Sequence, residues 1–124
     1  MTTATDERMA VAADIAQALA HPARLRILDL LRSEGAYVMH LTALLGRPQA
    51  NVSQHLAVLR EAELVVDERD GMTVVYRIRD PQVYEVVDRL LALAGRRTAR
   101  DGQQPLQPPP QTARGCRCPR CGGR

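Results

Sequence analysis

Aromatic residues are almost absent from this chain, whose 124 residues include three Tyr, no Phe and no Trp. A hydrophobic core must therefore be built from Leu, Val, Ile and Ala. A chain of this length forms one domain at most, and such a domain buries only a modest apolar centre. It is small enough that an interface with a second copy would matter for its stability.

Long apolar runs are also missing. No stretch approaches the roughly 20 apolar residues that a membrane-spanning helix needs, and the mixed acidic and apolar start is unlike a signal peptide. We therefore expect a cytoplasmic protein without a membrane partner. An enzyme is not expected, because no nucleophile, base and orienting acid recur in a recognisable arrangement and no Gly-rich phosphate loop is present.

Charge divides the chain into two parts. Residues 1–95 contain ten Arg against thirteen Asp and Glu, a net charge of −3, whereas residues 96–124 contain seven Arg against one acid, a net charge of +6. The second part is rich in Pro and Gln and has a single Leu, so it cannot bury enough apolar surface to order itself. We expect a folded domain over 1–95 and a disordered tail over 96–124.

Two helices separated by a short turn are predicted in the middle of the domain. Apolar residues at helical spacing mark the first over Val38–Leu45, and Gly46 suits the left-handed position that ends it. Pro48 suits the first turn of the second helix. One face of that helix carries three apolar side chains: Val52, Leu56 and Leu59. The pattern is typical of a helix-turn-helix.

The other face of the second helix suits the reading of DNA bases. Asn and Gln can bond bidentately to adenine in the major groove, and Ser or His can reach base edges or phosphates. The helix offers four such side chains: Asn51, Ser53, Gln54 and His55. The helix alone does not separate this interpretation from an ordinary surface helix whose polar residues are merely solvated.

A β-hairpin is predicted directly after this helix. Apolar and polar residues alternate over 74–79, and Asp70-Gly71 is a strong signal for the tight turn before them. A helix-turn-helix followed by a hairpin is a winged helix, although an unrelated hairpin packed on a helix gives the same pattern. The expected fold is therefore mostly α with a small β-hairpin, an α+β winged helix-turn-helix.

Further helices are predicted at both ends of the domain. Ile15–Ala20 and Leu25–Leu31 have helical spacing and are separated at His21-Pro22. Asp80-Pro81 starts a last helix with an apolar stripe: Val83, Val86, Val87, Leu90, Leu91 and Leu93. Such a stripe needs a partner surface, and a second copy of the chain is the natural candidate, although packing within the same subunit accounts for part of it.

The three histidines are expected to have different roles. His21 lies in the turn between two helices and is expected to be structural. His40 is expected to be an exposed or capping residue rather than a ligand. His55 lies on the helix with the DNA-reading pattern and is expected to contact DNA.

Three motifs together resemble the ArsR/SmtB family of transcriptional regulators. LAHPARLRILDLL over 19–31, NVSQHLAVLREAELV over 51–65 and DGMTVVYRI over 70–78 occur in the order and spacing of that family. The resemblance covers roughly residues 16–93. It implies a dimeric winged-helix repressor that binds a palindromic DNA operator and releases it when a metal ion or another inducer binds.

The resemblance also implies roles for single residues. The residues that match the family's DNA-reading helix are Gln49, Asn51, Ser53, Gln54 and His55. Those that match its wing are Arg69, Asp70, Gly71 and Met72, with Arg77 on the returning strand. Family dimers pair through the first and last helices, which here are about Glu7–Leu19 and Pro81–Leu93.

The two usual metal sites of the family are not matched by this sequence. One site uses a Cys pair in the helix before the DNA-reading helix, and Val38–Leu45 contains no Cys. The other uses Asp, His and Glu on the last helix, where Val83–Arg97 offers Glu85 and Asp88 but no His. A regulator of this type would need another sensing site, or would act without an inducer.

All three cysteines lie close together near the end of the sequence: Cys116, Cys118 and Cys121. The segment Cys-Pro-Arg-Cys-Gly favours a turn that directs two thiolates to one point, as in zinc knuckles, and Cys116 can supply a third. The fourth zinc ligand would be water, His40 or another side chain, or a thiolate of a second subunit. Three thiolates also suit trivalent arsenic or antimony, or Cu(I).

Other uses of this tail and of the domain stay open. Neighbouring arginines favour the reactive thiolate form of Cys, so redox or persulfide sensing competes with metal binding, and the tail could equally have no regulatory role. A winged helix can also serve as a protein-interaction module, since fold does not fix function. The slightly acidic domain makes that alternative relevant.

Overall fold

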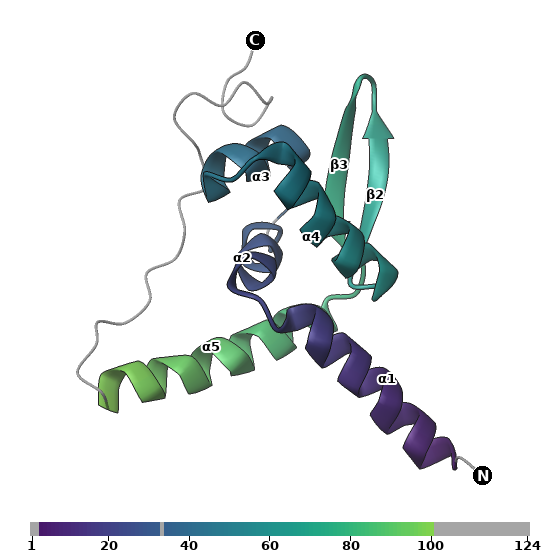
Figure 1. Cartoon of the computed structure of the whole chain (residues 1–124), viewed down its shortest axis with the longest axis vertical. Coiled ribbons are helices and arrows are strands. Elements are labelled where there is room, and N and C mark those ends of the chain that lie inside the picture. Colours follow the sequence, from purple (N-terminus) through teal and green to yellow (C-terminus); the bar gives the residue numbers. More distant parts are fainter. Residues whose placement is uncertain (1–2, 33, 101–124) are drawn as a thin grey trace.

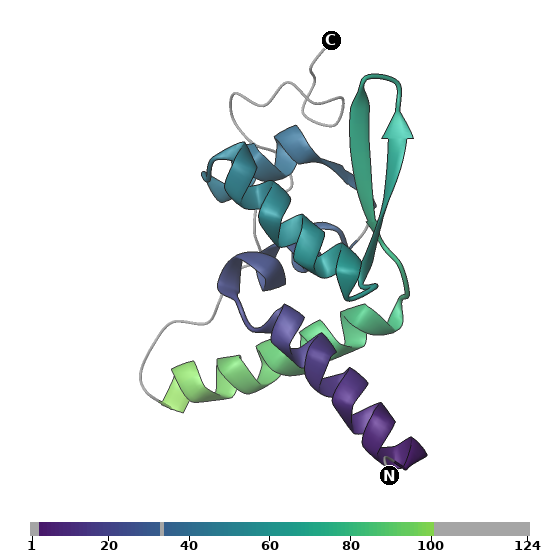
Figure 2. The ribbon, with the colours of Figure 1, turned by 45° about the vertical axis from the view of Figure 1, so that its right-hand side comes forward.

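The computed structural model describes residues 3–32 and 34–100, which form five helices and three strands. In chain order these elements are α1 (Ala4–Leu19), α2 (Pro22–Leu30), β1 (Ala36–Tyr37), α3 (Val38–Leu45), α4 (Gln49–Glu61), β2 (Val65–Asp70), β3 (Thr73–Ile78) and α5 (Gln82–Arg100). The hairpin rises beside α4, and α1 and α5 extend from the opposite end of the molecule (Figure 1; Figure 2). The mostly α fold with a small β-hairpin is confirmed.

Helix α2 lies at the centre and contacts α1, α3, α4 and α5. The largest side chains that are fully removed from solvent are aliphatic apart from one histidine: Ile27, Leu28, Leu30, Leu31, Leu41, Leu56, Leu59, His40, Val52, Val65 and Val87. The predicted aliphatic core is confirmed. Burial of such side chains, each contributing about 1.5–3 kcal/mol, drives the packing of the helices.

The break between α1 and α2 occurs where it was predicted. His21 has an extended backbone, and its Nδ1 accepts a hydrogen bond of 3.1 Å from the backbone N–H of Ala23. Pro22 is then the first residue of α2, a position where its missing N–H costs nothing. His21 therefore caps α2, which confirms its structural role.

The turn between α3 and α4 is tight because Gly46 adopts a left-handed conformation, with φ of 63°. Its backbone N–H donates to the carbonyl of Thr42, which ends α3. Pro48 was expected inside the first turn of the next helix, but it is the extended residue just before α4. Its ring has no N–H to donate, so it suits this position as well.

The sheet has one strand more than was predicted. Its order is β1-β3-β2, with antiparallel pairing throughout, and the two-residue turn at Gly71-Met72 follows the pair Asp70 and Thr73. The strand β1 is two residues long, which is too short to show a periodic pattern. Gly35, directly before β1, lets the chain lie close to β3, because a Cβ at this position would lie 2.6 Å from Cγ1 of Val75.

The last helix is longer than predicted. It begins after Asp80, whose side chain accepts from the backbone N–H of Gln82 at 2.9 Å, and it continues to Arg100. The boundary predicted between residues 95 and 96 therefore falls inside α5. Arg and Ala are good helix formers, and each residue added to an existing helix needs no new nucleation. The cysteines Cys116, Cys118 and Cys121 lie outside the described residues.

An ion-pair cluster fixes α5 to the end of α2. Arg32 bonds to Asp88 at 3.0 Å and to Asp29 at 3.0 Å, and its guanidinium lies 5.5 Å from the ring centre of Tyr84. The hydroxyl of Tyr84 donates to the carbonyl of Leu31. The hydrogen bond from Arg32 lowers the pKa of Asp88, so this link weakens when acid protonates the carboxylate.

None of the described helices is long and apolar enough to cross a membrane.

Candidate nucleic-acid interface

Helix α4 separates its apolar and polar side chains onto opposite faces. Val52, Leu56 and Leu59 have no measurable exposure, so they anchor the helix in the core. On the other side Gln49, Ser53 and Gln54 are exposed, and Asn51 is half-buried. The fold thus presents amide and hydroxyl groups on a rigid helix, which is the arrangement that reads bases in a major groove.

Asn51 has a partner within the turn that precedes the helix. Nη1 of Arg47 donates to Oδ1 of Asn51 at 3.3 Å. The amide NH₂ of Asn51 stays available for an acceptor such as N7 of a purine. Sequence reasoning missed this pair, although its spacing of four residues was visible.

His55 does not lie on the exposed face of α4 with Ser53 and Gln54, where it was expected, and its contact with DNA stays a prediction. The residue is 9% exposed, and its ring lies against the ring of His21, with centroids 4.4 Å apart. The reason is helical geometry, because His55 follows Val52 by three residues and precedes Leu59 by four, so it shares their buried face. Burial lowers its pKa, and His21, Arg24 and Arg47 lower it further.

His40 also differs from its prediction. It was expected to be exposed or to cap a helix, but it lies inside α3 and is 1% exposed. Its neighbour Leu41 is buried as well, so the two residues together form the core side of this short helix.

The wing carries more acid than base, but its carboxylates are engaged. Asp67 pairs with Arg60 at 3.3 Å, and Glu68 pairs with Arg77 at 3.5 Å. Asp70 accepts from the Tyr37 hydroxyl at 2.9 Å. These contacts reduce the negative field that the wing would otherwise present to a phosphate backbone.

Two side chains are left at the tip of the wing. Arg69 is exposed and has no ion-pair partner within residues 3–32 and 34–100, and Met72 is 99% exposed. The tip lies at the same end of the molecule as α3 and α4, opposite α1 and α5 (Figure 1; Figure 2). The tip of the wing therefore lies at the end of the molecule that also holds the helix-turn-helix, away from α1 and α5.

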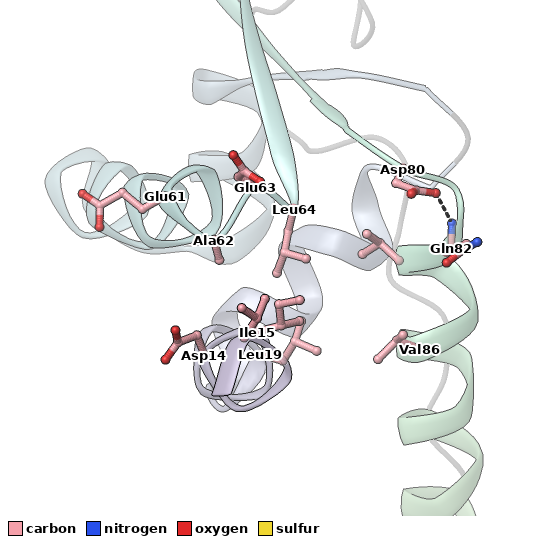
Figure 3. Close-up of a pocket in the computed structure, with 12 residues that line it drawn as sticks. Asp14, Ile15, Leu19, Glu61, Ala62, Glu63, Leu64, Asp80, Gln82 and Val86 are labelled. Carbon is pink, nitrogen blue, oxygen red and sulfur yellow. Dashed lines mark hydrogen bonds between the residues drawn. The ribbon is translucent and has the colours of Figure 1, made fainter. Parts of the chain in front are cut away.

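The opposite end holds an open groove of about 410 Å³ between α1, the turn after α4 and the start of α5. Its apolar lining consists of Val11, Ile15, Leu19, Ala62, Leu64, Val83 and Val86, and its polar lining of Asp14, Glu61, Glu63, Asp80 and Gln82. Figure 3 shows Ile15, Leu19 and Leu64 on one side and Val86 on the other. An uncovered apolar groove of this kind marks a contact surface.

A metal site is not formed by the described part of the chain, where no three His, Cys, Asp or Glu side chains come close enough to hold an ion. The site expected at Cys116, Cys118 and Cys121 stays a prediction.

The geometry defines a winged helix-turn-helix protein, and comparisons with known proteins agree. A model of the family described as a helix-turn-helix domain matches residues 19–68. The uncharacterised HTH-type transcriptional regulator Rv0081 of Mycobacterium tuberculosis is 42% identical over 89 residues, which are 71% of this chain and 75% of that protein. The nodulation protein NolR of Rhizobium meliloti is 35% identical over 96 residues, 77% of this chain and 79% of that protein.

Solved structures show the same relationship. NolR from Sinorhizobium fredii superposes with a TM-score of 0.67 at 33% identity, covering 75% of this chain and 93% of that one. The winged helix-turn-helix domain of Mb0332 from Mycobacterium bovis, described as homodimeric and as a possible ArsR-family regulator, has a TM-score of 0.69 at 26% identity, with 76% and 87% covered. The chain belongs to the ArsR/SmtB family of winged-helix transcriptional regulators.

Proposed function

We propose that this protein is a homodimeric repressor that binds a specific DNA operator through α4 and the wing. The observation that carries the proposal is the division of α4, whose apolar face is fixed in the core while its amide face is exposed. A helix held in this way presents base-reading groups with little loss of conformational freedom on binding.

The residues proposed to read bases are those of the exposed face: Gln49, Asn51, Ser53 and Gln54. Arg69 is proposed to contact a phosphate from the tip of the wing. Arg77 would do so only by exchanging Glu68 for a phosphate, because the two side chains already form an ion pair. The phosphate contacts would set the position of the protein on the duplex, and the base contacts would set the sequence that it recognises.

The second copy is proposed to cover the apolar end of the molecule. Exposed apolar side chains follow α1 and α5, where Met9 is 68% exposed and Leu93 is 60% exposed. The groove between α1 and α5 continues this surface. The related Mb0332 domain is described as homodimeric, and a palindromic operator requires such a two-fold arrangement.

Control of operator binding is proposed to reside in Cys116, Cys118 and Cys121. Three closely spaced thiols suit zinc or another thiophilic metal ion, and their oxidation is the alternative. The test is metal analysis of anaerobically purified protein beside the three single Cys→Ser variants, with operator affinity measured on the same samples with and without zinc, arsenite and oxidant. Equal metal content and equal affinity in all samples would remove this part of the proposal.

The function itself is tested by a gel shift on the DNA upstream of the protein's own gene. A complex that survives excess unrelated DNA supports a sequence-specific regulator. If no fragment of that region competes better than unrelated DNA under any of the conditions, the operator proposal fails and a protein-interaction module becomes the better interpretation.

A further inference from the structure

The ring contact between His21 and His55 joins the DNA-reading helix to the start of α2. The ring centroids are 4.4 Å apart, and the planes are tilted by 46°. His21 already uses Nδ1 to accept the backbone N–H of Ala23 at 3.1 Å, so its ring is fixed in place by the cap of α2. His21 therefore both caps α2 and packs against the ring of His55 in α4.

The surroundings of the His55 ring disfavour a positive charge. Nε2 of His55 is buried and has no hydrogen-bond partner among the described residues. Besides burial, the groups that lower the pKa of His55 are His21, Arg24 and Arg47, and no carboxylate is among them. Arg24 is held in place by its bond to the carbonyl of Ala18 at 3.3 Å.

The other elements packed against α4 do not supply a counter-ion. On α2, Asp29 is paired with Arg32 and Arg26 bonds to the carbonyl of Leu44. The last turn of α1 carries no charged side chain, and α3 has His40 as its one titratable group. The strand β2 meets the far end of α4, where Asp67 is engaged with Arg60. A proton on His55 would therefore create an unpaired buried cation, which is costly in a protein interior.

The least costly response to such a proton is for the ring to move away from His21 and reach water. His55 lies one residue after Gln54 and four after Asn51 on the same helix, so loss of its packing on His21 removes a contact that holds the polar face of α4 in place. We propose that His55 is a positioning residue whose neutral ring, packed against His21, holds α4 in the orientation that reads the operator, and that protonation of His55 releases this orientation. The inference rests on the proposed operator function.

The direction of the pH dependence follows from the lowered pKa of His55 in the folded protein. The unfolded or displaced state takes up a proton more readily than the packed state, so the packed state is fully favoured above the ordinary His value of about 6.5 and loses stability as the pH falls below it. Operator affinity therefore decreases on acidification.

The experiment measures operator affinity of the full chain by fluorescence anisotropy between about pH 8 and about pH 5.5 at constant ionic strength. We expect wild-type affinity to fall roughly tenfold across this range, since each subunit of a dimer takes up a proton on release. The variant His55→Phe keeps a ring against His21 but cannot be protonated, so its affinity should stay level. The control His40→Gln changes another buried histidine and should keep the wild-type pH dependence.

A second measurement uses the wild-type protein alone, so its result does not depend on whether a variant folds. NMR titration of the imidazole resonances of the wild-type protein should show His55 changing at the pH where operator affinity is lost, with circular dichroism showing intact helices. Wild-type affinity that is level or rises in acid, or a His55 resonance that titrates apart from the loss of binding, would overturn the positioning role alone. Absence of operator binding at every pH would instead overturn the proposed function, and the inference with it.

Discussion

The helices α4 and α5 are both amphipathic, but they differ in what covers their apolar side. The apolar residues Val52, Leu56 and Leu59 of α4 have no measurable exposure, whereas Val86 and Leu93 of α5 are 44% and 60% exposed. Within one subunit the apolar face of α4 is packed in the core, whereas α5 meets the core through Val83, Val87 and, in part, Leu91 and leaves the rest of its apolar stripe exposed.

This difference separates two kinds of surface. On α4 the free surface is polar, so it suits a hydrated and charged partner such as DNA. On α5 the free surface is apolar, so it is stabilised by packing against another apolar surface. The apolar face of α4 is therefore already buried within one subunit, while the apolar surface at the other end of the molecule needs a second copy to cover it.

The packing of α4 is tested most strongly by Leu56→Ala, which removes a side chain from its buried face. We expect the free energy of unfolding to fall by about 2–5 kcal/mol, the usual cost of such a cavity, as measured by urea unfolding at one fixed protein concentration. Val58→Ala is the matched control, because Val58 lies on the same helix and is 36% exposed. Equal losses in the two variants would mean that α4 is not anchored through this face.

The second test places a charge on the uncovered face of α5. Leu90 is 38% exposed in the single subunit, so Leu90→Glu should leave the subunit folded but bury a carboxylate in a dimer. We expect the dimer dissociation constant to rise roughly a hundredfold, a loss of about 3 kcal/mol, by analytical ultracentrifugation. The control is Met72→Glu at the tip of the wing, where the side chain is 99% exposed. Unchanged dimerisation in Leu90→Glu would show that another surface pairs.

Sequence patterns predicted α4 well because its two faces follow the helical period without interruption. The same helical period places His55 on the buried face with Val52 and Leu59. Its polar side chain nevertheless suggested an exposed position. Its burial depends on His21, which is 34 residues earlier in the chain, and a single sequence does not show which distant groups meet.

Other features were not predictable for equally physical reasons. The strand β1 exists because Gly35 allows close approach to Val75, a tertiary contact rather than a local preference. The extension of α5 to Arg100 depends on propagation of a helix that has already formed. The amino-acid composition of this segment does not reveal that effect. The pairing of the wing carboxylates likewise depends on strand register.

The third test concerns the polar face of α4. Gln54→Ala should weaken operator binding by about 1–3 kcal/mol, roughly fivefold to 150-fold, because the amide that bonds a base edge is removed. Binding to unrelated DNA and dimerisation should not change. Gln17→Ala makes the same substitution on the exposed face of α1 and should leave operator affinity as it is. A decrease in the control that matches the decrease in Gln54→Ala would remove α4 from base reading.

The smallest expected effect belongs to the wing, where Arg69→Ala should weaken operator and unrelated DNA by similar factors. A phosphate contact carries no base information, so its removal lowers the salt dependence of binding, by about one unit of slope for each phosphate that is no longer neutralised. Arg79→Ala, at an exposed position after β3, is the control and should keep the wild-type slope.

Anisotropy titrations over a salt series separate phosphate binding from base reading, since Gln54→Ala should change the discrimination between operator and unrelated DNA but not the salt slope. If Arg69→Ala altered discrimination with an unchanged slope, the wing would read bases instead, and the polar surface of this regulator would extend beyond α4.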